Sequence, residues 1–289
     1  MPAKIDSPLT TLELKCRRPV EHLLAGEYHS VFKGRGIEFE DARPYQPGDD
    51  VRAMEWKVTA RTGTPHIKRY TEEREQFIYL LVDVSASLLD DPGGARRDTV
   101  AEICALITLA ATKNNDRVGL ILFSDRLELV VPPAKGHQHA QRVIEALMTF
   151  QPVGKGTSFP IALDCLGHMA RKRSVFFVVS DFLADDFIDD LGALAIRHDI
   201  NAVHLIDRRH RPGESRGLLR IHDSESGEPG LVDLAESRDE GARHQRNLQE
   251  LLLNHGVDLM EVAVGENCVT ALNDFFRSRQ RRIDDETGG

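Results

Sequence analysis

The sequence predicts an α/β protein in which a doubly wound, mainly parallel sheet follows a smaller, partly β N-terminal module. From Glu75 onward, short apolar runs typical of buried strands alternate with longer segments of helical periodicity. Such alternation favours a parallel sheet with helices on both faces. Residues 1–74 differ, because they are rich in charge, glycine and proline. We therefore divide the chain into a module of residues 1–74 and an α/β domain of residues 75–282.

The N-terminal module is expected to combine one helix, over residues 9–24, with an irregular, β-rich segment. "YQPGDD" is a turn signal, and "TPHIKRYT" has the composition of a short exposed strand. Asp49 and Asp50 are expected to cap this turn and to pair with nearby arginines. Because the module has few apolar residues, we expect it to fold only against the α/β domain, with Tyr45 and Trp56 in or near the contact.

Six strands are predicted in the α/β domain. Continuous apolar runs indicate strands that are covered on both faces, and the run that stops at two prolines suits a sheet edge. The predicted strands are "QFIYLLVD", "RVGLILFS", "RLELVVPP", "SVFFVVSD", "INAVHLID" and "GVDLMEVAV". The predicted helices cover residues 95–112, 137–149 and 160–170 and the segments "DDFIDDLGALAIRHD" and "NCVTALNDFFRSRQRR".

Two segments are expected to lie outside the packed α/β layers. Residues 208–237 are rich in glycine and charge, and they predict a surface insert with a hairpin in "LLRIHDSESGEPGLVDL". Residues 283–289 are predicted to be a disordered tail.

Asp83 and Asp181 each close a buried strand, and the topology brings these two strands together. In the usual strand order of a doubly wound sheet, 3-2-1-4-5-6, the first and fourth strands are neighbours where the order reverses. Ligands bind beyond the carboxyl ends of the strands at this switch point. Both carboxylates are therefore expected to face one crevice.

Hydroxyl groups accompany these two acids in the pattern of an oxygen-ligand metal site. Ser85 and Ser87 follow Asp83 as D-x-S-x-S, and "GKGTSFP" offers Thr157 just before a helix. Two carboxylates and three hydroxyls suit Mg²⁺, Mn²⁺ or Ca²⁺ and not zinc. The carboxylates balance a divalent charge, and one position is left for water or an incoming acid. The alternative interpretation of D-x-S-x-S is a helix cap after a strand.

This set resembles the metal-ion-dependent adhesion site of von Willebrand factor A domains, in which D-x-S-x-S, a Thr and an Asp lie at the carboxyl end of the sheet. The resemblance covers residues 76–279 and makes the expected fold von Willebrand factor A-like. It implies that Ser85, Ser87 and Thr157 contact the metal, and that Asp83 and Asp181 act directly or through water.

The N-terminal segment "GRGIEFEDARPYQPGDDVRAMEWKVTART" resembles a second, longer signature. The bacterial family catalogued as domain of unknown function 58 has G-x-G-x-E-F, then R-x-Y-x-x-G-D-D-x-R-x-x-x-W, before a von Willebrand A-like domain. The matching residues are Gly34, Gly36, Glu38, Phe39, Arg43, Tyr45, Gly48, Asp49, Asp50, Arg52 and Trp56. Members of that family often accompany MoxR-type AAA+ ATPases, so the resemblance implies a partner of that kind.

Composition and motifs exclude several other classes of function. A net charge of −9 disfavours a general nucleic-acid binder. No segment approaches the roughly 18 apolar residues of a membrane span, so we expect no membrane insertion and a cytoplasmic protein. "GKGTS" lacks the spacing and residue order of a phosphate-binding loop.

We conclude from the sequence that the protein is a metal-dependent protein-binding module, an adaptor or chaperone-like partner of an AAA+ ATPase or its client. The rival hypothesis is a hydrolase that uses a Mg²⁺-activated water. A hydrolase needs a general base near that water, and only Asp90 and Asp91 are close in sequence. A third possibility is an α/β scaffold with a vestigial site.

Overall fold

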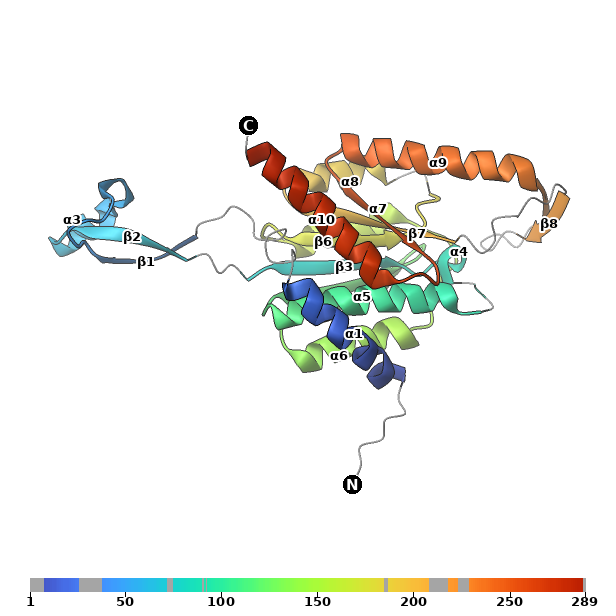
Figure 1. Ribbon diagram of the computed structural model, residues 1–289, viewed down its shortest axis with the longest axis horizontal. Coiled ribbons are helices and arrows are strands. Elements are labelled where there is room, and N and C mark those ends of the chain that lie inside the picture. The colour runs from blue at the N-terminus through green and yellow to red at the C-terminus, as the bar shows by residue number, and fades with distance from the viewer. Residues whose placement is uncertain are drawn as a thin grey trace, which may run out of the picture.

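The computed structural model describes residues 8–25, 38–71, 75–89, 91, 93–184, 187–207, 218–222 and 229–287 (Figure 1). At its centre is a six-stranded sheet with the order β10-β7-β6-β3-β4-β5. The strands are β3 (Phe77–Asp83), β4 (Arg117–Phe123), β5 (Leu127–Ala134), β6 (Val175–Ser180), β7 (Asp199–Ile206) and β10 (Asp258–Ala263).

The order of the strands confirms the predicted doubly wound α/β fold. Neighbours from β10 to β4 pair in parallel, and only β5, at one edge, is antiparallel. In sequence order this is 3-2-1-4-5-6, so β3 and β6 lie side by side where the winding reverses. The register pairs Val82 with Val179, which brings the carboxyl ends of the two strands level with each other.

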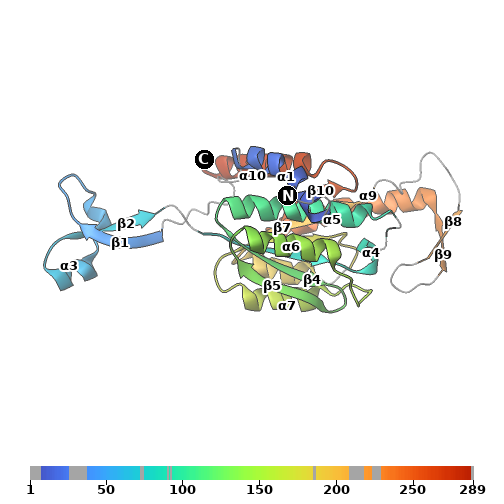
Figure 2. The same cartoon turned by 90° about the horizontal axis from the view of Figure 1, so that it is seen from below.

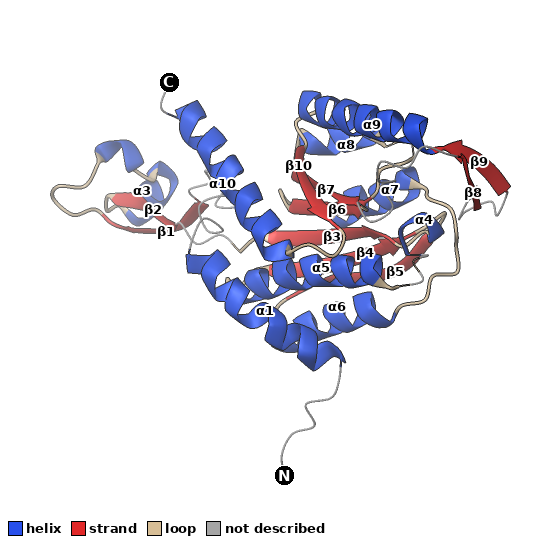
Figure 3. Cartoon of the chain, turned by 45° about the vertical axis from the view of Figure 1, so that its right-hand side comes forward, coloured by secondary structure: helices blue, strands red, loops and turns tan. Residues whose placement is uncertain are grey.

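Helices cover both faces of the sheet (Figure 3). Helices α1, α5, α6 and α10 share one buried cluster with inward-facing residues such as Leu80, and helices α7, α8 and α9 share the other with residues such as Leu81. This alternation along β3 is that of a strand buried on both faces. The helices are α1 (Pro8–Ala25), α4 (Ala86–Leu89), α5 (Ala95–Lys113), α6 (His137–Thr149), α7 (Phe159–Met169), α8 (Ile188–Ala195), α9 (Leu234–Asn254) and α10 (Cys268–Thr287).

The end of the chain departs from the sequence prediction in two places. The expected hairpin is present as β8 (Leu218–His222) and β9 (Pro229–Asp233), but it leads directly into the 21-residue helix α9, which we did not predict. The prediction of a disordered tail was wrong for residues 283–287, because α10 continues to Thr287.

Helix α1 packs on the α/β domain and not on the rest of the N-terminal module. Cys16 and Val20 are buried in the same cluster as α5 and α6. The Lys15 ammonium also lies 2.5 Å from the Glu102 carboxylate on α5. We had assigned this helix to the N-terminal module of residues 1–74. It belongs instead to the core that covers the sheet.

Residues 38–71 form a small separate unit, which we call the N-terminal lobe (Figure 2). It consists of β1 (Glu38–Pro44), the 3₁₀ turn η1 (Val51–Ala53), α3 (Trp56–Thr62) and β2 (His66–Thr71), with β1 and β2 antiparallel. Figures 1 and 2 show it beyond the amino end of β3, away from the sheet.

Polar contacts organise this lobe. The Arg43 guanidinium donates two hydrogen bonds, of 2.8 and 2.7 Å, to the Asp49 carboxylate, and the Asp50 carboxylate accepts the Arg52 N–H. The predicted turn and its arginine pairing are thereby confirmed. Trp56, however, is 68% exposed, so our expectation that its side chain packs against the α/β domain was wrong.

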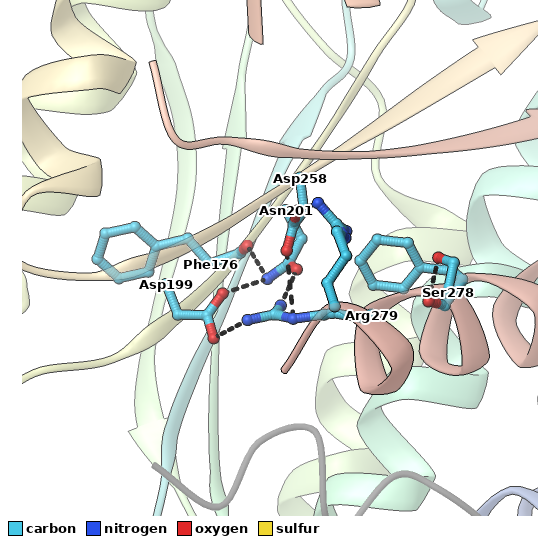
Figure 4. A network of polar contacts seen from close by, with 8 residues as sticks. Phe176, Asp199, Asn201, Asp258, Ser278 and Arg279 are labelled. Atoms are coloured by element: carbon cyan, nitrogen blue, oxygen red, sulfur yellow. Dashed lines mark hydrogen bonds and ion pairs between the residues drawn. The ribbon is translucent and has the colours of Figure 1, made fainter. Parts of the chain in front are cut away.

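A buried polar network holds α10 against the amino ends of β7 and β10 (Figure 4). The Arg279 guanidinium contacts the carboxylates of Asp199 and Asp258 and the side-chain oxygen of Asn201. The Asn201 amide in turn donates to the Phe176 carbonyl at 3.1 Å. Within this network the side chains of Arg279, Asp199, Asn201 and Asp258 all have polar partners, which is the condition for burying charge without a large penalty.

Arg279→Met is expected to lower the free energy of unfolding by about 3 kcal/mol, because two mostly buried carboxylates lose their shared cation. Arg282→Met is the matched control. Arg282 also contacts Asp258, at 2.6 Å, but its side chain is 47% exposed, and its loss should cost below about 1 kcal/mol. Urea unfolding of both variants measures the difference, and equal effects would show that the network does not hold the helix.

Candidate metal site at the carboxyl ends of β3 and β6

Asp83 ends β3, and its carboxylate is fully buried. The backbone N–H of Ser85 donates to Asp83 Oδ1 at 2.8 Å, and the hydroxyl of Ser180, at the end of β6, donates to Asp83 Oδ2 at 2.8 Å. The first bond turns the chain away from the strand, and the second joins the two strand ends. The carboxylate is thus fixed from both sides.

The two serines of D-x-S-x-S lead from Asp83 to Asp181. The hydroxyls of Ser85 and Ser87 lie 3.1 Å apart, and the Ser87 hydroxyl hydrogen-bonds the Asp181 carboxylate. The backbone N–H of Leu183 also donates to that carboxylate, at 3.3 Å. The structure therefore brings together four of the five residues predicted from the sequence in one polar cluster.

The fifth residue, Thr157, lies on a loop that touches this cluster. The N–H of Ala86, between the two serines, donates to the Lys155 carbonyl at 2.8 Å. The Glu128 carboxylate accepts the N–H groups of Val153 and Gly154 at 3.1 and 2.6 Å. The loop that carries Thr157 is thus held against the D-x-S-x-S segment, with the half-buried Thr157 one residue before the cap of α7.

Glycine is required at one position of this loop. A Cβ atom at Gly154 would lie 2.1 Å from the Ser124 hydroxyl oxygen and 2.3 Å from Asp125 Oδ1. Only a residue without a side chain lets the loop approach the end of β4 so closely.

Sequence reasoning missed Arg96, on the first turn of α5. Its guanidinium donates to the Ser87 carbonyl at 2.5 Å and to Asp207 Oδ2, after β7, at 3.0 Å. The Asp91 carboxylate accepts a hydrogen bond from the backbone N–H of Arg96 and so caps the start of α5. Arg96 thereby fixes the backbone of the D-x-S-x-S segment. Nothing in the sequence of α5 marks one arginine for this role.

Phe182 was also missed, although it holds Asp181 in place. It is fully buried and has φ +52°, a left-handed conformation that costs a non-glycine residue on the order of 1–3 kcal/mol. Its ring stacks on Phe159, at the start of α7, with centroids 5.8 Å apart, and contacts Phe187 at 5.3 Å. This packing compensates the strain and couples the turn after β6 to the helix after Thr157.

Burial sets the acid–base behaviour of the two carboxylates. It raises the pKa of Asp83 to about 6, to which the nearby Asp181 contributes, although hydrogen bonds from Ser85 and Ser180 oppose the rise. Burial likewise raises the pKa of Asp181, against hydrogen bonds from Leu183 and Ser87 and the charge of Arg96. Two adjacent, desolvated acids with hydroxyls around them are a donor set that fits a hard divalent cation.

Asp83→Asn is expected to stabilise the metal-free protein by about 2 kcal/mol at pH 7.5. The pKa of Asp83 in the folded state, about 6, lies above its ordinary value of 3.8. The folded state therefore holds this proton more tightly, and the stability that it contributes is lost as the pH rises through 6. Urea unfolding in a chelator at pH 7.5 and 4.5 tests this. The advantage of the variant should shrink at pH 4.5, and a variant that is less stable at pH 7.5 would contradict it.

Among the described residues, no group of three or more His, Cys, Asp or Glu side chains is arranged to hold a metal ion; the cluster above contributes only two such residues. Within the same residues, no helix has the length and apolar character needed to cross a bilayer.

The chain is similar over nearly its whole length to mycobacterial proteins. It is 31% identical to the uncharacterized protein Rv1480 of Mycobacterium tuberculosis and equally to Mb1516 of Mycobacterium bovis, covering 96% of this chain and 90% of each relative. It is 25% identical to the uncharacterized protein YeaD of Bacillus subtilis, over 50% of this chain and 35% of that protein.

Solved structures with a similar fold include BatB from Bacteroides thetaiotaomicron, with 13% identity, a TM-score of 0.46 and coverage of 74% of this chain and 100% of that one. The SpRpn10 VWA domain has 12% identity, a TM-score of 0.40 and coverage of 70% and 95%. Since these TM-scores are below 0.5, the fold assignment rests on the strand order.

The sequence predicted a family from its N-terminal signature. A family model that matches most of the chain tests this prediction. The model described as "Protein of unknown function DUF58" matches residues 41–250, which include the turn around Asp49 and all five candidate site residues. The chain belongs to this DUF58 family.

Proposed function

We propose that this protein binds a divalent cation, Mg²⁺ or Mn²⁺, at Asp83 and Asp181 and uses it to hold an acidic side chain of a partner protein. The observation that carries the proposal is the cluster of a buried carboxylate, Asp83, and a half-buried one, Asp181, with serine hydroxyls beside them at the switch point of the sheet. Ser85, Ser87 and Thr157 would complete the oxygen ligands. The cation would supply the positive charge that balances the two carboxylates. It would also offer an open coordination position for an oxygen atom of the partner.

Exposed apolar side chains on the same elements support a protein as the ligand. Leu183, two residues after Asp181, is 64% exposed; Val153, on the Thr157 loop, is 75% exposed; and Ile161, on α7, is 43% exposed. Apolar side chains close to a charged centre help to exclude water when a partner docks, and this makes a carboxylate–metal contact favourable.

The hydrolase alternative lacks an evident general base among the described residues. Asp91 accepts hydrogen bonds from the backbone N–H groups of Gly93 and Arg96 at the start of α5, so its carboxylate is engaged in capping a helix. The other candidate from the sequence, Asp90, lies outside the described residues. We therefore favour binding over catalysis, with a MoxR-type AAA+ ATPase or its client as the partner that the family resemblance implies.

The proposal is tested by measuring binding to a MoxR-type ATPase from the same genome, with the client assayed in parallel, in Mg²⁺ and in EDTA. Binding should require the metal and return when Mg²⁺ is restored. A phosphatase and esterase screen in Mg²⁺ and Mn²⁺ separates the two hypotheses, since turnover that is lost in Asp83→Ala would favour the hydrolase.

A further inference from the structure

The N-terminal lobe exposes the one tryptophan of the chain. Trp56 is 68% exposed and Val51 is 61% exposed. Tryptophan is among the residues most enriched in the energetic centres of protein interfaces. Trp56, with Val51 five residues before it, is therefore a candidate contact surface, separate from the candidate metal site at the other end of β3 (Figure 1).

Exposed basic residues lie close in sequence to Val51 and Trp56, whereas several acids of the lobe are engaged within it. Asp49 pairs with Arg43, Asp50 caps η1, and Glu55 caps α3 and lies 3.6 Å from the Lys68 ammonium. The exposed side chains of Arg52, Lys57 and Arg61 have no ion-pair partner within the described part of the chain. These three exposed bases next to Val51 and Trp56 in the sequence favour an acidic partner.

A second copy of this chain offers an acidic partner surface. Residues 38–71 contain six acidic and six basic side chains, so the net charge of −9 belongs to the remainder of the chain. A cavity of about 400 Å³ lies between β10 and α10. Its lining combines apolar, acidic and neutral polar residues: Val262, Ala263 and Ala271; Glu261, Glu266 and Asp274; and Asn267 and Thr270.

This cavity suits an aromatic anchor flanked by bases. Its volume is within the roughly 300–1,000 Å³ range of ligand pockets, and strand β10 beside it is an edge of the sheet. The lobe and the cavity lie at opposite ends of the sheet, since the lobe precedes the amino end of β3 and the cavity lies at the carboxyl end of β10. The lobe of one copy can therefore reach the cavity of a second copy, whereas within one chain the two lie far apart.

We propose that the Trp56 surface of the N-terminal lobe docks into the cavity between β10 and α10 of a second copy of this chain. The indole enters the cavity, and Arg52, Lys57 and Arg61 face its carboxylates. The contact is head-to-tail, so copies add in rings or open chains. Added salt weakens the assembly, because its charges lie at the surface.

The sole tryptophan makes the contact directly measurable. Dilution of the wild type should shift the Trp56 fluorescence toward that of a solvent-exposed indole, and sedimentation should show larger species at high concentration. Trp56→Ala should raise the dissociation constant at least about tenfold. The matched control is Ile196→Ala, which removes a side chain that is 86% exposed on another surface and should leave assembly unchanged.

Charge reversal identifies the cavity as the docking site. Lys57→Glu and Asp274→Lys should each weaken self-association, and a mixture of the two variants should restore it, because each supplies the intact half that the other lacks. Self-association should persist in EDTA and in the Asp83→Ala variant. This result would show that it does not depend on the metal site. A wild type that stays monomeric with unchanging fluorescence, or a mixture that does not recover, would overturn the proposal. If Trp56 were required for binding to anionic vesicles and the protein did not self-associate, the partner of the Trp56 surface would be a membrane and not a second copy of the chain.

Discussion

Asp83→Ala is expected to weaken Mn²⁺ binding by more than about 100-fold while leaving the fold intact. The variant removes one of the two carboxylates that would balance the charge of the cation. A single opposite unit charge at about 4 Å contributes on the order of 4 kcal/mol at the effective dielectric of a protein, and about 2.7 kcal/mol already corresponds to 100-fold. The fold should survive, because the lost side chain is a buried acid whose ionisation opposes folding. Calorimetric titration and circular dichroism measure the two effects.

The matched control for this variant is Asp189→Ala. Asp189 is an exposed acid in the first turn of α8, away from the cluster. Its removal lowers the net negative charge by the same amount and should leave Mn²⁺ affinity unchanged. Equal losses in both variants would mean that Mn²⁺ responds to overall charge and not to this site. Unchanged affinity in Asp83→Ala would remove Asp83 from the ligand set.

Ser85→Ala and Thr157→Ala are each expected to weaken binding of the partner ATPase or its client at least tenfold. Each variant removes a hydroxyl ligand, and so weakens the metal that would hold the partner carboxylate. Loss of a central, water-excluded contact typically costs ~2–4 kcal/mol, or roughly 30- to 1,000-fold in affinity. EDTA should cause the same loss of binding in the wild type. Added Mg²⁺ should restore binding to the wild type but not to either variant.

Ser158→Ala provides the control within the same loop. Its hydroxyl is adjacent to Thr157 but makes no capping hydrogen bond to α7, and its backbone N–H donates to the Ser124 carbonyl in either sequence. Biolayer interferometry with these variants in Mg²⁺ and in EDTA should show full binding for Ser158→Ala in Mg²⁺. If a true partner binds all variants equally well, the scaffold interpretation takes the place of metal-bridged recognition.

The sheet and most of the site could be predicted because they follow from strong local signals. Uninterrupted apolar runs marked the buried strands, and the usual strand order of a doubly wound sheet then placed Asp83 beside Asp181. Ser180 escaped notice, since it is simply the last residue of a buried run. Phe182 gave no signal either, because its left-handed backbone is imposed by rings that pack from α7 and α8.

The two larger errors have different physical causes. Helix α9 carries many charged residues, and over residues 243–254 it buries only Leu248 and Leu252, so its apolar signal is weak after a glycine-rich insert. Trp56 was expected at a contact because the module has few apolar residues. The lobe instead relies on the Arg43–Asp49 pair and backbone capping, and its large apolar side chain remains exposed.

Paramagnetic NMR with Mn²⁺ tests most directly whether a divalent cation binds between β3 and β6. Bound Mn²⁺ broadens the amide signals of nearby residues, so a substoichiometric titration locates the ion. We expect the signals of residues 84–87, 156–158 and 181–183 to disappear first and to be unaffected in Asp83→Ala. Broadening that begins elsewhere, for example around Glu261, Glu266 and Asp274, or no selective broadening at all, would contradict the metal site.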